Sequence, residues 1–440
     1  MYARVEMLLG IISLTVGLLA LMVVFPESWW TDRRFSMPRR WEFSREVMLV
    51  GLDERYAERY GYGPTSPGYL ASVVRASLAF NPSAIALDFR LGEPEAAETG
   101  MDSLAAAVRE AHERGVPVLI PTVLATWQGN TVVARVPPAG LAGRVMMGFV
   151  EWDMLPAPRD FPLARQVGEG CYVLSLPAAA VAAHRRRVTP AAPACLGPGT
   201  VTEAALQRVL RDLGRSPDPR RHVPLYFAGP VHQTREMVFQ SSEHILQDAA
   251  GRAIPAGMEG KLVLIAALYP HPEGEDEIGT PFGPERGGLF HLYAIDTLLR
   301  RDPLPRYVGR PGTILLAVLM FAGVFAVWRR GPAQGWVVSV ITLVSYIALG
   351  FLLFPLSGLM LPIAAPLCAG LFATALGFIV YGEEGEPAQE PPASASAPPP
   401  VPPAGVDAVP KPAAPAPFRA SRRLRRSGLL LMLTRTRRRS

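Results

Sequence analysis

The feature that most constrains the fold of this chain is a set of long apolar runs that contain no charged side chain. A helix needs about 20 apolar residues to cross the hydrocarbon core of a bilayer. Four runs approach that length, at residues 7–25, 311–328, 336–354 and 358–381. A buried hairpin of core helices is the alternative for the last two, but core helices rarely stay apolar for so long. A purely soluble enzyme is excluded, and four transmembrane helices are expected, one before and three after a long middle segment.

Basic residues in short loops predict the orientation, because such loops stay on the cytoplasmic side. Arg329 and Arg330 lie between the second and third runs, and an arginine-rich segment follows the fourth. Residues 26–310 and the short hairpin at 355–357 then lie outside the cytoplasm. The opposite orientation is favoured by four arginines after the first run, Arg33, Arg34, Arg39 and Arg40. We follow the C-terminal arginines, which predicts a multi-pass protein of the bacterial inner membrane with a periplasmic main domain and a cytoplasmic tail.

The C-terminal part of the chain differs in composition from the rest. Residues 382–418 are rich in proline and alanine, with too little apolar mass for a core, which predicts a disordered cytoplasmic linker. Residues 419–440 mix arginines with the apolar stretch 429–433, a combination suited to anionic lipid at the inner leaflet. A membrane-surface role is expected for Arg422, Arg423, Arg425, Arg426, Arg437, Arg438 and Arg439. A protein partner is the alternative. Nucleic acid is the weaker candidate, because the net charge of +6 comes from this tail.

The middle segment alternates short apolar strands with helical patterns. Strands at 47–52 and 84–87 flank a helix at 67–80, which makes a β-α-β unit. The same alternation predicts further strands at 116–124, 144–151, 223–227 and 261–267, and further helices at 101–114, 174–187, 201–213 and 289–300. The fold class is therefore α/β, with a mixed, largely parallel sheet and crossover helices.

Candidate binding residues follow the strands. Asp53 and Asp88 end the first two strands, and ligands of open α/β sheets bind beyond the carboxyl ends of the strands. Treated as neighbours, these strands would present both carboxylates to one crevice. Capping of the following turn or helix is the simpler interpretation for each aspartate. Asp276, in an acidic loop, and His291, at the opening of the last helix, complete the candidate set, with a solvated loop and an ordinary surface or capping histidine as their alternatives.

Motifs for catalysis are missing from the sequence. It contains no Gly-x-x-x-x-Gly-Lys-Ser/Thr phosphate loop, no zinc-ligand spacing, no nucleophile elbow and no kinase motif series. No enzymatic activity, cofactor or metal is expected. Of the three cysteines, Cys368 lies in an apolar run, which leaves Cys171 and Cys195 as the only pair able to cross-link outside the cytoplasm. Free thiols are the simpler interpretation of this pair.

Several segments in the same order resemble one known family. The strand ending at Asp53, the glycine- and proline-rich turn at 60–64 and the strand at 84–89 are similar to the opening of a type 2 CHASE domain. Residues 171–180 resemble its mid-domain Ser-Leu helix, and 225–230 its strand ending in glycine. The closest similarity is at the end, in 260–265, Asp276, 280–283, Gly288, His291 and 294–299. The family is a sensory extracellular domain associated with cyclases and histidine kinases, and its arrangement of one span before and three after the domain is similar too.

The chain also departs from the family pattern. Where relatives tend to have a Trp-Pro-Trp-Pro-Arg turn, residues 62–67 read Tyr-Gly-Pro-Thr-Ser-Pro. The usual Gly-Ala after the late strand is replaced by Ala266 and Ala267. If the turn contributes to a ligand site in relatives, the ligand here is expected to differ. Relatives often continue into a kinase or cyclase module, and residues 382–440 contain none.

The resemblance and the spans together predict a membrane-bound sensor. Residues 26–310 would bind an unknown extracytoplasmic ligand, and the membrane helices at 311–381 would transmit the signal to a separate cytoplasmic partner. The alternative is a structural or envelope-assembly protein whose domain binds other proteins. A ligand-sized pocket at the two aspartates would favour sensing, whereas a filled crevice with an exposed apolar patch would favour assembly.

Overall fold

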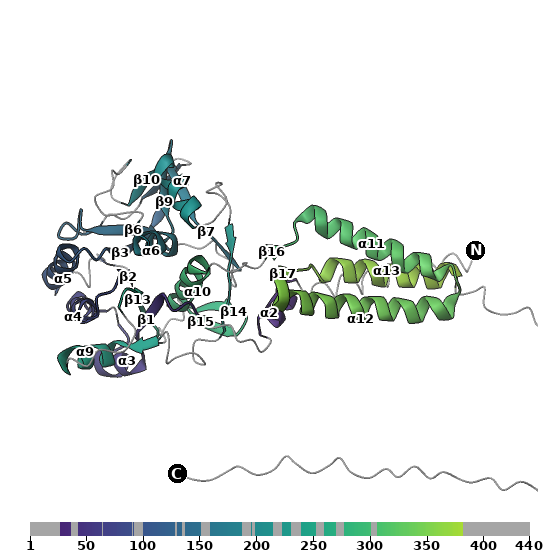
Figure 1. Ribbon diagram of the computed structural model, residues 1–440, viewed down its shortest axis with the longest axis horizontal. Helices are drawn as coiled ribbons and strands as arrows, with labels where there is room; N and C mark the ends of the chain where they lie inside the picture. Colours follow the sequence, from purple (N-terminus) through teal and green to yellow (C-terminus); the bar gives the residue numbers. More distant parts are fainter. Residues whose placement is uncertain are drawn as a thin grey trace, which may run out of the picture. The chain divides into compact units, whose positions relative to one another are not determined.

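The protein is described by a computed structural model, drawn in Figure 1. The predicted first span at 7–25, the candidate Asp276, the linker at 382–418 and the arginine tail lie outside the described residues. The described residues are 27–36, 43–63, 65–89, 91, 100–127, 130–133, 137–150, 159–186, 195, 199–213, 222–229, 239–251, 259–269, 277–300 and 306–381.

A six-stranded sheet forms the centre of the domain, in the order β12-β1-β13-β2-β3-β6 (Figure 1). All of its pairings are parallel. The predicted α/β class with a largely parallel sheet is thus confirmed. The assumption that the strands ending at Asp53 and Asp88 are neighbours is wrong, because β13 lies between them. The strands are β1 (Val47–Leu52), β2 (Ala84–Asp88), β3 (Val118–Thr122), β6 (Val145–Phe149), β12 (Phe239–Ser241) and β13 (Leu262–Ala267).

β13 suits a central position because its side chains are apolar on both faces of the sheet. Successive side chains of a strand point to opposite faces. Leu264 is buried in the core on one face, with helices α6 (Leu176–His184) and α10 (Gly287–Leu299). Ile265 is buried in the core on the other, with helices α4 (Pro67–Leu78), α5 (Met101–Glu113) and α9 (Ser242–Gly251). The result is a three-layer α/β/α arrangement, with the two sets of helices on opposite sides of the sheet (Figure 1).

Local sequence signals explain where the main helices begin and end. Ser66 stands at the N-cap of α4 and Pro67 at its first position, where a missing backbone N–H costs nothing. α5 ends at Glu113, two residues before Gly115, which has a φ of +72° that favours glycine. The predicted ends of these helices were therefore correct to within two residues.

Smaller antiparallel elements border the central sheet. The largest is a three-stranded sheet in the order β10-β9-β8, followed in the chain by α7 (Glu203–Asp212). The bounds of the smaller strands are β4 (Leu124–Trp127), β5 (Asn130–Val133), β7 (Asp160–Pro162), β8 (Ala164–Gly168), β9 (Cys171–Leu174), β10 (Thr200–Thr202), β11 (His222–Pro224), β14 (Glu277–Thr280) and β15 (Gly283–Arg286). The pairs β11–β7, β14–β15 and β4–β5 are each antiparallel.

A disulfide joins Cys171 of β9 to Cys195, across a sequence separation of 24 residues. The interpretation of these cysteines as free thiols was therefore wrong. Cys368 takes no part in this disulfide. Cys171 belongs to a small buried apolar cluster that also contains Phe149. Disulfides persist in oxidising compartments, so the bond agrees with a domain outside the cytoplasm.

Among the described residues, three helices are long and apolar enough to cross a membrane: α11 (Arg310–Trp328), α12 (Pro332–Ser357) and α13 (Ala364–Tyr381). The three predicted spans after the domain are thus present as helices. The hairpin differs from the prediction, because Pro355 lies inside the last turn of α12 and the connection runs over 358–363. Gly358 ends α12 with a φ of +70°, a conformation that favours glycine. The connection contains β17 (Leu359–Met360), which pairs in parallel with β16 (Arg306–Tyr307) before α11.

The disulfide leads to a first prediction. Replacing Cys171 and Cys195 together by serine should lower the free energy of unfolding by about 3 kcal/mol, because a closed loop of this length restricts the unfolded chain. Denaturant unfolding of the full-length protein in detergent measures this change. Cys368→Ser is the matched control and should leave stability nearly unchanged. Titration of the unfolded, unreduced wild type should find one reactive thiol, and three would contradict the bond.

Candidate functional site

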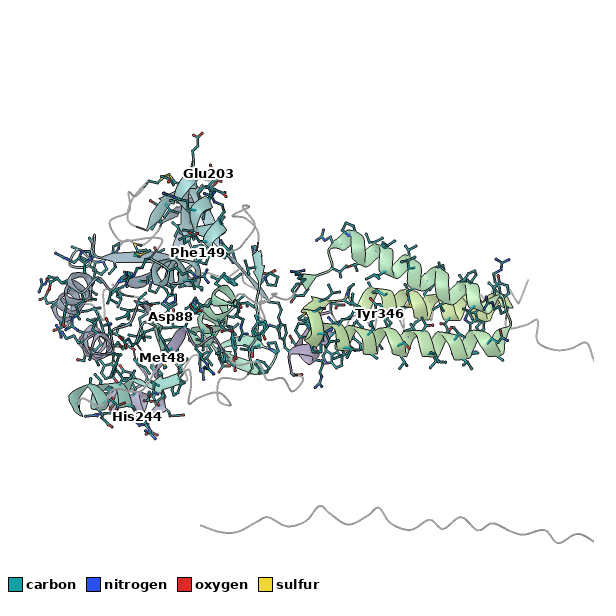
Figure 2. The ribbon with its side chains drawn as sticks, in the orientation of Figure 1. Met48, Asp88, Phe149, Glu203, His244 and Tyr346 are labelled. Atoms are coloured by element: carbon teal, nitrogen blue, oxygen red, sulfur yellow. A yellow bond between two sulfur atoms is a disulfide. The ribbon has the colours of Figure 1, made fainter. Side chains whose placement is uncertain are left out.

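The carboxyl ends of β2 and β13 lie against the start of α10, and two of the four candidate residues meet there. Asp88, the last residue of β2, places its Oδ1 atom 3.5 Å from Nε2 of His291 on α10 (Figure 2). His291 is 3% exposed, so its interpretation as a surface histidine was wrong. The two side chains form an ion pair only when the imidazole is protonated. The pair thus combines a buried histidine with a carboxylate at the end of a central strand.

The approach of α10 to the sheet depends on Gly288. A Cβ atom at this position would lie 2.5 Å from Cβ of Ala266 and 3.6 Å from Oδ2 of Asp88. A larger residue would therefore push the first turn of α10 away from the end of β13. The close contact at Gly288 is what brings His291 to Asp88.

Asp53 occupies a different part of the same sheet edge, and β13 separates it from Asp88. It stands at the N-cap of α3 (Glu54–Tyr60), but its side chain makes no capping hydrogen bond. Its Oδ1 atom is buried and has no hydrogen-bond partner among the described residues. The capping interpretation of this carboxylate is not supported. The expectation that both aspartates face one crevice stays a prediction.

No group of three or more His, Cys, Asp or Glu side chains suited to a metal ion occurs within the described residues. Asp276 and most of its acidic loop fall outside them, so its predicted role stays a prediction. Glu277 begins β14 and forms an exposed ion pair with Arg286, at 2.8 Å. The described end of the acidic loop thus belongs to a solvated surface.

Sequence reasoning missed a group of five tyrosines in and around α3, the helix that Asp53 precedes. They come from α3, the turn after it, α4 and the end of β13: Tyr56, Tyr60, Tyr62, Tyr69 and Tyr269. We call this group the tyrosine cluster. Its ring centroids lie 4.6–6.2 Å apart along the contacts that link the five rings, the usual range for aromatic pairs. The only signal in the sequence was the replacement of the family's tryptophan-rich turn by a turn with tyrosine.

Glu285 of β15 is a second unusual carboxyl group near α10. Its Oε2 atom is buried without a hydrogen-bond partner among the described residues. Burial raises the pKa of Glu285 to about 7, although the hydroxyls of Tyr293 and Thr280 act in the opposite direction. Burial also raises the pKa of Tyr293, whose hydroxyl donates to the carbonyl of Gly229 at 3.0 Å. The carboxyl of Glu285 therefore changes its charge near neutral pH.

A third group of contacts joins the domain to the membrane helices through α2 (Glu27–Phe35). The carboxylate of Glu27 accepts hydrogen bonds from the backbone N–H groups of Ile363, at 3.0 and 3.2 Å, and Ala364, at 2.9 Å. These groups open α13, and a carboxylate is favourable at the N-terminus of a helix. Burial raises the pKa of Glu27, while the two backbone bonds and Arg34 lower it. Glu27 thus connects α2 directly to a membrane helix.

Arg34 of α2 makes a second connection to the same hairpin. It is fully buried and donates to the carbonyl of Leu361. Its guanidinium also lies 5.9 Å from the ring centroid of Phe351 in α12. Arg34 was one of the residues that argued against the predicted orientation. The structure gives this arginine a buried contact with the α12–α13 hairpin.

The other end of the connection lies in the domain. Arg159 forms a bidentate pair with Asp32 of α2, with both N–O distances 2.7 Å, and donates to the carbonyl of Gly279 in β14 at 2.9 Å. Phe35 packs between the domain and the bundle, with its ring centroid 5.2 Å from Phe227 and 5.0 Å from Phe354 of α12. Helix α2 therefore contacts the sheet domain and the membrane helices at once.

The sequence model of the CHASE2 domain matches residues 8–342, from the first apolar run into α12. Neither the curated proteins nor the solved structures contain a match to the chain.

The carboxyl of Glu285 gives a prediction for pH. Its pKa in the folded protein is above the ordinary value of 4.5, so its contribution to stability is full below pH 4.5 and lost as the pH rises through about 7. Glu285→Gln should therefore remove this pH dependence and stabilise the domain at pH 8 by up to about 3 kcal/mol. Thermal unfolding of the full-length protein between pH 5 and 8 measures it.

Glu277→Gln, on the same hairpin but exposed, is the control and should change stability little at any pH. A Glu285→Gln profile parallel to that of the wild type would refute the assignment.

Proposed function

The chain belongs to the CHASE2 family of sensory domains, which are extracytoplasmic, and from this premise we propose that it is a membrane-bound sensor. Its domain at 26–310 binds a signal outside the cytoplasm, and the membrane helices pass the signal to a separate partner in the cytoplasm. The family is sensory rather than catalytic, which fits a protein without enzymatic activity.

The observation that carries this proposal is the double contact of α2. A signal crosses a protein through an element whose position two sites both influence. Asp32 and Phe35 hold α2 to the domain, and Glu27 and Arg34 hold it to the ends of α12 and α13. A shift of α2 in response to the domain therefore moves the start of a membrane helix.

The surface of the domain supports sensing over assembly. Envelope-assembly proteins use contiguous exposed apolar patches. Outside α11, α12 and α13, the large hydrophobic side chains that the structure describes as exposed are Tyr60, Tyr62 and Tyr307. Two of these belong to the tyrosine cluster and lie in the chain within ten residues of Asp53, whose Oδ1 atom is buried without a hydrogen-bond partner among the described residues. This is the composition of a small binding site rather than of a docking face.

The tail completes the proposal. The segment 382–418 connects the last membrane helix to the arginines of 419–440, which bind anionic lipid at the inner leaflet through charge. This holds a site for the cytoplasmic partner close to the membrane.

Transmission through α2 can be measured by hydrogen exchange. Arg159→Met removes the bidentate pair with Asp32 but touches neither Ile363 nor Ala364. If α2 couples the domain to the bundle, the amides of Ile363 and Ala364 should exchange roughly tenfold faster, which corresponds to about 1.4 kcal/mol. The measurement uses the full-length protein in nanodiscs.

Arg286→Met is the matched control. It breaks an exposed ion pair with Glu277 on the β14–β15 hairpin, which Arg159 also contacts, and it should leave the exchange of both amides unchanged. Equal exchange in Arg159→Met and the wild type would show that α2 does not transmit.

The orientation gives a separate prediction. A phosphatase that is active only outside the cytoplasm should be active when fused after Arg310 and inactive when fused after Ser440. Activity of the Ser440 fusion would reverse the topology, and with it the location of the partner.

A further inference from the structure

The tyrosine cluster has two layers with different exposure. Tyr56 and Tyr269 are buried, and hydroxyl groups hold the inner rings in place: Tyr269 donates to the carbonyl of Gly63 at 3.1 Å. Tyr60 and Tyr62 form the outer layer, at 51% and 39% exposure. Ordered aromatic faces that are open to solvent, backed by rings with satisfied hydroxyls, are suited to bind a ligand rather than only to fill a core.

The cluster already holds a cation. The guanidinium of Arg59 lies 5.3 Å from the centroid of the Tyr60 ring, within the range of a cation–π contact. The same guanidinium pairs with Oε2 of Glu243 at 3.0 Å, while Oε1 of Glu243 accepts from the hydroxyl of Tyr69 at 3.0 Å. A positive group is therefore recognised here by an aromatic face and a carboxylate together.

The two members of this ion pair differ in exposure. The side chain of Glu243 is 12% exposed, whereas that of Arg59 is 65% exposed. A largely buried carboxylate requires a positive partner, but an exposed arginine on a surface contributes little binding energy and exchanges readily with solvent. The carboxylate and the Tyr60 ring are thus the permanent part of the site, and the arginine is replaceable.

Two further polar atoms, which belong to residues close in the chain to those of the site, are buried without a hydrogen-bond partner among the described residues. Asp53 immediately precedes α3, which carries Tyr56 and Tyr60, and its Oδ1 atom is buried without a partner among the described residues. Ser241 immediately precedes Ser242, whose hydroxyl lies 2.9 Å from that of Tyr69, and the Ser241 hydroxyl is also buried and without a described partner. Buried polar groups are normally hydrogen-bonded, so these atoms are candidates for contacts with a ligand.

We propose that the tyrosine cluster binds a small organic cation, an ammonium or guanidinium compound, in the place that Arg59 fills. Tyr60 supplies the aromatic face and Glu243 the counter-charge. This inference rests on the proposed sensor function and names the chemical class of its ligand. Arg59 competes with the ligand for the same groups. The apparent affinity is therefore the intrinsic affinity multiplied by the fraction of molecules in which Arg59 has left the site.

Choline and its neutral isostere 3,3-dimethylbutan-1-ol test the proposal. They have the same shape, and only choline carries a charge. Isothermal titration of the full-length protein in nanodiscs should detect binding of choline and at least tenfold weaker binding of the neutral alcohol. Guanidinium is titrated in the same way. Equal binding of choline and the neutral alcohol would overturn the inference, and so would the absence of binding by both choline and guanidinium.

Substitutions separate the roles of the residues. Tyr60→Leu and Glu243→Gln should each weaken choline binding about fivefold or more, while Tyr60→Phe, which keeps the ring, should bind like the wild type. Arg59→Gln should bind choline about fivefold more tightly because it removes the competitor. The matched control is Arg75→Gln, an exposed arginine that pairs with Glu110 on another surface. Weaker choline binding by Arg59→Gln would contradict the proposal, because the arginine would then support the site and not compete for it.

The result is separable from the test of the sensor function. If neither choline nor guanidinium binds but Arg159→Met accelerates exchange at Ile363 and Ala364, the ligand class is wrong and transmission through α2 stands. If choline binds and the Arg159→Met variant exchanges like the wild type, the cation site stands and the sensor mechanism fails.

Discussion

The rest of the domain depends on the pairing of β13 with β1 on one side and with β2 on the other. β13 leads through the β14–β15 hairpin into α10, and Gly288 allows α10 to lie against Ala266 at the end of the strand. α10 then holds Asp296, fully buried, which accepts from the Ser44 backbone at 2.6 Å and from Arg300 at 2.7 Å. Burial raises the pKa of Asp296 and Arg300 lowers it. Since an unpaired buried charge is strongly destabilising, these contacts keep α10 joined to the start of β1.

The central position of β13 also separates the carboxyl ends of β1 and β2 from each other. With β13 in the middle, Asp88 and His291 lie on the side of α10, and Asp53 lies on the side of α3 and the tyrosine cluster. The two sides have different chemistry. One is a buried histidine–carboxylate pair, and the other combines exposed tyrosine rings with the largely buried carboxylate of Glu243. A ligand at the second side would reach the membrane helices through the sheet and α2 rather than through direct contact.

Helix α2 connects a domain outside the membrane to apolar helices that offer few polar groups for contact. The helices of the bundle present apolar surfaces to lipid, so polar contacts that report on the domain must sit at their ends. Glu27 and Arg34 use the unsatisfied backbone groups there: the N–H groups that open α13 and a carbonyl of the hairpin. Pairing of β16 with β17 adds a second link at the same level. The charged residues are thus placed where backbone groups need partners.

The sequence by itself determined the local elements. The bounds of β1, the starts of α4 and α5 and the three apolar helices followed from periodicity, caps and turn residues, because these signals act within a few neighbouring residues. Tertiary structure decided which elements meet. Whether β1 touches β2, whether Cys171 reaches Cys195, where Arg34 finds a carbonyl and how five tyrosines gather all depend on contacts between residues far apart in the chain. Sequence patterns do not say which residues far apart in the chain come together, since each of these side chains has several chemically equivalent partners. Only the packing of the whole domain selects one of them.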